Sequence, residues 1–149
     1  MTPTPRCTTF GAAHTKTDFN PIKRRFERGG TGKFCVSLTC AKDNADKATV
    51  AFVVANAAAA SNQQTLVFLS IEGVRLSQKG FADGIHEEGF AALKDLMDNF
   101  VKAGGTIWVC SPCFKKRKLD ENNLVGGASI VGGAKLVEFL SDGTPCISY

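Results

Sequence analysis

Thr65-Leu66-Val67-Phe68-Leu69 is a run of five residues in which only the first is polar. A strand with apolar side chains on both faces is typical of the buried middle of a parallel sheet. Residues 34–38 and 106–109 are further short strand-like runs, and residues 144–149 are expected to close the chain as a strand. Helical segments lie between these runs, and the alternation predicts an α/β domain with a mostly parallel sheet flanked by helices.

The clearest helical segment repeats apolar residues at spacings of three and four positions: Leu93, Leu96, Met97, Phe100 and Val101. This spacing places them on one face of an α-helix, which Gly104-Gly105 is expected to end. A second helix is predicted over the alanine-rich residues 45–60, with Asp43 or Asn44 as the capping residue. A last helix is predicted over residues 134–140.

Charge separates the first 31 residues from the rest of the chain. Residues 1–31 carry six basic and two acidic side chains, so they hold the whole net charge of +4, whereas residues 32–149 carry twelve of each. We expect residues 1–31 to form an extension that is partly disordered or packed on a neighbour, and residues 32–149 to form one domain. No aromatic stacking pattern accompanies the basic residues, so we expect no nucleic acid partner.

The cellular compartment is predicted from two patterns that the sequence does not show. No apolar run reaches the roughly 18 to 20 residues that a membrane span needs, and the N-terminus has no apolar core of a secretory signal. We therefore predict a cytoplasmic protein without membrane contact. Its six cysteines are then expected to be reduced, catalytic or metal-binding rather than paired in structural disulfides.

The tetrapeptide Cys110-Ser111-Pro112-Cys113 directly follows the apolar run at 106–109. Thiols three positions apart can reach each other, and the basic run at 115–118 favours the nucleophilic thiolate. In parallel sheets, ligands bind at the carboxyl ends of the strands. We therefore predict that Cys110 and Cys113 are catalytic and that one of them has a lowered pKa. The competing interpretation is two buried thiols that act as small apolar side chains.

Charged residues near this strand end are candidates to support the thiols. Glu72 and Arg75 follow the strand at 65–69, and Arg75 could hold an anionic persulfide or substrate. The alternative is an ordinary surface ion pair. Lys115, with the basic residues that follow it, could neutralise a thiolate or dock an acidic partner. The alternative there is a solvated helix face.

Two further residues, His86 and Cys40, are weaker candidates. His86 could supply a proton near the thiols, or it could lie solvated in its polar loop. Cys40 could approach Cys110 if the strands that precede the two residues are neighbours in the sheet. A four-ligand zinc site usually needs a second C-x-x-C or a pair of histidines, and the remaining cysteines and histidines lack such spacing. We therefore predict no metal and no cofactor.

Several short segments occur in a particular order along the chain: Val67-Phe68-Leu69 with Glu72-Gly73-Val74-Arg75-Leu76; Gly89-Phe90; Ala103-Gly104-Gly105; Val109-Cys110 with Pro112-Cys113; and residues 128–140. As an ordered set they resemble the DsrE/DsrF-like (YchN-like) sulfur-relay family. Residues 1–31 lie outside the resemblance.

The resemblance implies a three-layer α/β fold that assembles into homo-oligomers, either trimers or hexamers. It also implies that Cys110 accepts sulfane sulfur as a persulfide and passes it to an acceptor thiol. Cys113 belongs to a subset of the family with a C-x-x-C sequence. The implied partners are sulfur donor and acceptor proteins or small persulfides, and the implied activity is that of a sulfurtransferase or sulfur carrier.

Two other functions remain open on the sequence. Cys110 and Cys113 could act together as a dithiol/disulfide oxidoreductase or as a persulfide reductase. Alternatively, the chain could be a non-catalytic oligomeric scaffold whose cysteines are structural or bind a metal.

Overall fold

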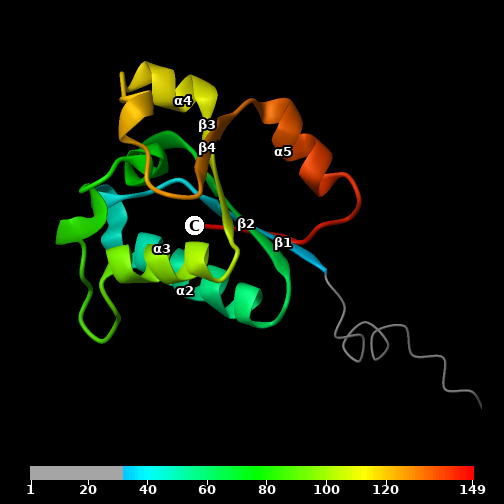
Figure 1. Ribbon diagram of the computed structural model, residues 1–149, viewed down its shortest axis with the longest axis horizontal. Helices are drawn as coiled ribbons and strands as arrows, with labels where there is room; N and C mark the ends of the chain where they lie inside the picture. Colours follow the sequence, from blue (N-terminus) through cyan, green and yellow to red (C-terminus); the bar gives the residue numbers. More distant parts are fainter. Residues whose placement is uncertain (1–31) are drawn as a thin grey trace, which may run out of the picture.

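The computed structural model describes residues 32–149 (Figure 1), so the extension predicted for residues 1–31 lies outside it. Within the described residues, five strands form one sheet in the order β4-β3-β2-β1-β5, and every pair is parallel. The strands are β1 (Lys33–Leu38), β2 (Gln64–Leu69), β3 (Thr106–Cys110), β4 (Ala128–Val131) and β5 (Cys146–Ser148). The sheet confirms the predicted fold class.

Helices make the connections between these strands. The α-helices of the described residues are α2 (Ala45–Ala60), α3 (Leu93–Lys102), α4 (Ser111–Lys116) and α5 (Gly133–Leu140). The 3-10 helices are η1 (Lys42–Asn44), η2 (Ile71–Ser77), η3 (Ala82–Gly84) and η4 (Glu121–Asn123). Among residues 32–149, no helix combines the length and the apolarity that crossing a bilayer demands.

The α2 helix spans the range predicted for it and is capped by Asn44. The side-chain oxygen of Asn44 accepts a hydrogen bond of 3.1 Å from the Lys47 backbone N–H, which satisfies one of the free donors of the first turn. Asp43, the other predicted cap, accepts from the Ala41 backbone N–H at 2.6 Å instead. The side chains of Asp43 and Asn44 thus each accept one backbone hydrogen bond in the turn between β1 and α2.

One face of the sheet packs against α2 and α3 and forms the main core. The buried side chains that point to this face are Val36, Leu38, Val67, Leu69, Ile107 and Val109. The two helices lie side by side on this face (Figure 1), where Phe52 and Phe100 meet edge to face at 6.0 Å. Asn56 of α2 also donates a hydrogen bond of 2.9 Å to the Leu96 carbonyl of α3.

The opposite face of the sheet is covered by α5. Side chains alternate along a strand, so the residues between those of the main core point here: Cys35, Leu66 and Phe68, joined by Val131. Trp108 of β3 and Phe139 of α5 meet edge to face at 5.5 Å. The sheet thus lies between helices on both faces, which confirms the three-layer arrangement.

Strand β4 is the element that the sequence did not predict. Its four residues lie between two glycine pairs, which indicate turns and hide so short a strand. The structure pairs it with β3, with Ile107 opposite Ala128 and Cys110 opposite Val131. As a result β3 is an internal strand with a neighbour on each side, and its last residue, Cys110, is paired with β4.

The carboxyl ends of the parallel strands meet at one edge of the sheet, where η2 follows β2 and α4 follows β3. Gly73 of η2 lies directly against the end of β1. Its backbone N–H donates a hydrogen bond of 3.0 Å to the Thr39 carbonyl. A Cβ atom at this position would lie only 2.5 Å from the Leu38 carbonyl oxygen, so glycine allows η2 to dock here.

We predict that Gly73→Ala destabilises the domain by about 1–3 kcal/mol, because the added methyl group forces η2 away from the backbone of β1. Gly84→Ala is the matched control, since a Cβ at Gly84 meets no heavy atom within 4 Å. Urea unfolding monitored by circular dichroism measures both changes. Equal stability of the two variants would contradict the close packing at Gly73.

Candidate functional site

The two predicted thiols lie at the carboxyl edge of the sheet. Cys110 is the last residue of β3 and the N-cap residue of α4, whose first turn contains Pro112 and Cys113. Both cysteines are partly exposed and are free thiols. Phe114, the next residue of α4, is buried in the main core and anchors the helix. The structure therefore presents both sulfur atoms near the surface on a fixed turn.

The electrostatics of Cys110 differ from the prediction. Burial raises the pKa of the Cys110 thiol above its ordinary value, and contact with the Cys113 thiol acts in the same direction. The Cys113 backbone N–H and the charge of Arg117 both lower the pKa, but they do not outweigh burial. The predicted lowering of the pKa is thus wrong for Cys110, because the lysines beside it in sequence do not offset the loss of solvation at the end of β3.

A carboxylate between two guanidinium groups joins η2 to α4 at this edge. Glu72 accepts a hydrogen bond of 2.7 Å from Nε of Arg75 on one oxygen. Its other oxygen accepts from Arg117 at 2.9 Å (Nε) and 2.7 Å (Nη2). Arg117 also donates from Nη1 to the Cys113 carbonyl at 3.2 Å. The network therefore fixes the turn that carries the thiols.

The exposed fractions of the side chains show which partner is most enclosed. Arg117 is 11% exposed, whereas Glu72 and Arg75 are 35% and 38% exposed. Hydrogen bonds from Arg75, and then from Arg117, lower the pKa of Glu72, so its carboxylate stays charged at neutral pH. Arg75 thus forms the ion pair that was one of its two predicted interpretations, and part of its guanidinium remains open to solvent.

Arg117 is the residue that sequence reasoning did not single out. It lies within the predicted basic run, from which the candidate was Lys115. The side chain of Lys115 is exposed and makes no hydrogen bond or ion pair to another described residue. The only local indication of a structural role for Arg117 is that it follows Cys113 by four positions, about one helical turn. Its main partner, Glu72, is 45 positions away in the sequence. The basic run therefore divides into one structural arginine and solvated lysines.

Neither His86 nor Cys40 makes a side-chain hydrogen bond to Cys110 or Cys113 in the described part of the chain. His86 is exposed in the loop before α3, and its Nε2 lies 2.9 Å from the Phe90 carbonyl oxygen. Cys40 is buried after β1, with its sulfur 3.7 Å from the Thr39 hydroxyl. Because β2 lies between β1 and β3, the condition for an approach of Cys40 to Cys110 is not met.

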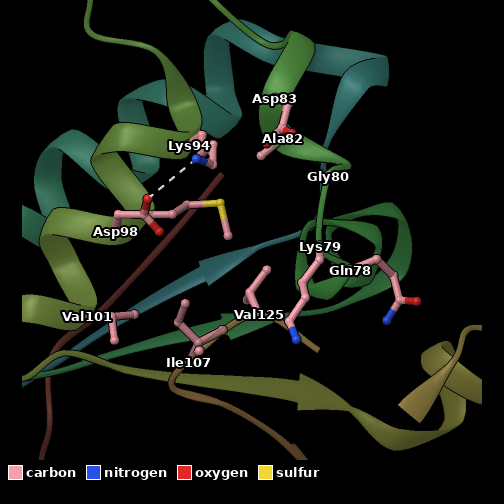
Figure 2. A pocket seen from close by; sticks show the side chains of 12 residues that line it. Gln78, Lys79, Gly80, Ala82, Asp83, Lys94, Asp98, Val101, Ile107 and Val125 are labelled. Carbon is pink, nitrogen blue, oxygen red and sulfur yellow. Dashed lines mark ion pairs between the residues drawn. The ribbon is translucent and has the colours of Figure 1, made fainter. Parts of the chain in front are cut away.

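A cavity of about 190 Å³ lies away from the thiols, between α3, the segment after η2 and the loop before β4. In Figure 2, Val101, Ile107 and Val125 line one side of it, while Lys94 and Asp98 approach each other at 3.9 Å on α3. Neither cysteine of the C-x-x-C sequence lines this space. Within residues 32–149, no three His, Cys, Asp or Glu side chains are grouped so that they could hold a metal ion.

The sequence of the described domain matches one known family. Residues 32–149 match the DsrE/DsrF-like family over their full extent. The chain belongs to the DsrE/DsrF-like family. This confirms the resemblance drawn from the ordered segments, and it assigns the C-x-x-C turn to a member of that family.

Two relatives and one solved structure are similar to this chain. An uncharacterized protein of Methanocaldococcus jannaschii, MJ0760, is 32% identical over 103 residues, which are 69% of this chain and 38% of that protein. The chain therefore spans well under half of that relative. A second uncharacterized protein of the same organism, MJ0989, is 26% identical over 120 residues, with 78% and 99% covered. The crystal structure of the ychN protein from E. coli has a TM-score of 0.58 at 12% identity, covering 78% and 99%, so it shares the fold.

We predict that Glu72→Gln lowers the Tm of the domain at pH 7 by a few degrees, because an amide N–H would face a guanidinium N–H. The folded pKa of Glu72 lies below its ordinary value of about 4.3, so its stabilisation is present above that pH and is lost as the pH falls through the folded pKa. Thermal melts of both proteins from pH 7 to pH 2 should therefore converge in acid. A constant difference would contradict the ion pair.

Proposed function

We propose that this DsrE/DsrF-like protein is a cytoplasmic sulfur-relay protein that carries sulfane sulfur as a persulfide on Cys110. The observation that carries the proposal is a partly exposed Cys110 thiol at the carboxyl end of β3, on the same turn as Cys113 and within the field of Arg117. This edge of a parallel sheet is where ligands approach in α/β folds. Family membership supports the same chemistry.

Two exchange steps describe the relay. The Cys110 thiolate attacks the outer sulfur of a donor persulfide, the donor thiolate leaves, and a persulfide forms on Cys110. An acceptor thiolate then attacks the outer sulfur of that persulfide and takes it away, which restores the Cys110 thiolate. Arg117 favours the anionic sulfur in both states, and the exposed part of Arg75 is available to an anionic donor.

The raised pKa of Cys110 sets the pH dependence of loading. Less of the thiol is ionised at neutral pH, which lowers the rate, while a thiolate of higher pKa is intrinsically more nucleophilic, with a Brønsted slope of about 0.4–0.5. Because the slope is below one, the loss of thiolate outweighs the gain in nucleophilicity. Loading should therefore accelerate as the pH rises.

The placement of two partly exposed thiols on one turn favours a second candidate, persulfide reduction. Cys113 could attack the inner sulfur of the Cys110 persulfide, which releases hydrosulfide and leaves a Cys110–Cys113 disulfide. The same pair without a persulfide would be a dithiol oxidoreductase. The products differ, because the relay returns free thiols and both alternatives leave a disulfide.

The partners in this proposal are sulfur donor and acceptor proteins or small persulfides. We also propose that the chain assembles with copies of itself as a trimer or hexamer.

We predict that polysulfide or thiosulfate adds one sulfur, about 32 Da, to Cys110, because it is the thiol proposed as the nucleophile. Cys110→Ser should abolish the adduct while leaving the melting curve unchanged, since the residue is partly exposed. Mass spectrometry of the intact chain and its peptides measures loading, and its rate should rise with pH. In Cys113→Ser the adduct should persist.

Three outcomes separate the proposed functions. A stable adduct on Cys110 supports the relay. A disulfide between Cys110 and Cys113 with release of hydrosulfide supports persulfide reduction, and a mass loss of about 2 Da without hydrosulfide supports the dithiol oxidoreductase. Full loading of Cys110→Ser would contradict all three.

We predict that Arg117→Met slows alkylation of Cys110 by iodoacetamide at pH 7 severalfold, because the charge that favours its thiolate is removed. Arg117→Lys should restore part of the rate by returning a cation. Lys115→Met, which replaces an exposed cation in the last turn of α4, is the matched control and should leave the rate unchanged. Equal slowing by Arg117→Met and Lys115→Met would show that net charge, rather than the position of Arg117, sets the reactivity.

A further inference from the structure

A second pair of cysteines lies on the opposite half of the sheet. Cys35 of β1 is the direct register partner of Cys146 of the edge strand β5. Side chains of laterally paired residues in a parallel sheet project to the same face, and neighbouring strands are about 4.8 Å apart. This separation falls within the Cα–Cα range of about 4.4–6.8 Å that a disulfide requires. The backbone therefore places both thiols where they can bond.

The two thiols differ strongly in exposure. Cys35 is completely buried beneath α5, among Leu66, Phe68 and their neighbours, whereas Cys146 is exposed. Burial, followed by contact with the Cys146 thiol, raises the pKa of Cys35 to about 12. Cys35 is therefore a protonated thiol at neutral pH, and reagents in solution can reach the pair only through Cys146.

We propose that Cys35 and Cys146 form a second dithiol site, which reacts with low-molecular-weight disulfides to give a disulfide between β1 and β5. The Cys146 thiolate attacks one sulfur of the small disulfide, and one small thiolate leaves. Cys35 then loses its proton and attacks the Cys146 sulfur of the mixed disulfide, which expels the second small thiolate. Two protein thiols are oxidised, and the small disulfide is reduced to two thiols.

This pair is separate from the C-x-x-C turn. Cys35 aligns with Leu66 of β2, which aligns with Thr106 of β3, so Cys110 lies four residues further along the strand direction. At about 3.3 Å per residue, that offset alone is about 13 Å, with β2 in between. In the folded chain the two pairs therefore cannot exchange partners, and the second site can be tested without the first.

The consequence of oxidation is a covalent link at the edge of the sheet. The strand β5 has only three residues, all exposed, and it is the last strand of the chain. Cys35 and Cys146 are 111 positions apart, so their bond closes almost the whole domain into a loop. Long closed loops constrain the unfolded chain most, and the link should therefore raise the Tm.

The test uses the full chain with Cys110→Ser and Cys113→Ser, which removes the other reactive pair. After incubation with glutathione disulfide, peptide mapping without reductant should find Cys35 linked to Cys146, with a mass loss of about 2 Da. The Tm should rise by at least about 5 °C and return on reduction with dithiothreitol. A stable glutathione adduct on Cys146 with Cys35 unmodified would overturn the proposal, as would a bond from Cys146 to Cys7 or Cys40.

Three further substitutions in the same background control the result. Cys146→Ser should lose the linked peptide and the rise in Tm, and it replaces an exposed side chain, so the fold is retained. Cys35→Ala should retain glutathione on Cys146, because the thiol paired with it across the strands, which would expel the glutathione, is gone. Cys40→Ser is the matched control and should form the link as its parent does. A Tm rise on oxidation that survives Cys146→Ser would contradict the assignment.

Discussion

The parallel register of the sheet is the constraint on which the rest of the structure depends. Because β1, β2 and β3 run in the same direction and in step, their carboxyl ends reach one edge together. The segments that leave this edge, η2 and α4, are then forced into contact. Glu72 and Arg117 meet there although 45 positions separate them in the sequence. The turn that carries the thiols is therefore fixed both by β3, which it follows, and by its contacts with η2.

The charges at this edge position the thiols more than they activate them. Glu72 uses both oxygens to hold two guanidinium groups, and a further N–H of Arg117 donates to the Cys113 carbonyl. Much of the positive charge beside Cys110 is thereby neutralised, and burial dominates its pKa. Such a site holds its nucleophile in a fixed position while burial favours the protonated thiol.

The two cysteine pairs show how location decides the chemistry of the same side chain. At the end of β3, two thiols share a helical turn and both are partly exposed, so either can meet a reaction partner. Across β1 and β5, one thiol is sealed beneath α5 and the other faces solvent, so the exposed one must react first. The difference in burial between Cys35 and Cys146 thus sets the order in which the two thiols react, and the sequence alone does not predict this difference.

The sequence by itself determined the layered α/β class, the range of α2, the apolar face of α3 and the strand end at Cys110, because each depends on local periodicity or capping. It could not reveal β4, because its four residues are too few to show a strand periodicity and lie between two glycine pairs. Only the tertiary structure decided that Arg117 rather than Lys115 is the structural cation, that the pKa of Cys110 is raised, and that Cys146 lies beside Cys35. The physical reason is that solvation and pairing depend on neighbours brought from distant parts of the chain, and these are set by strand order.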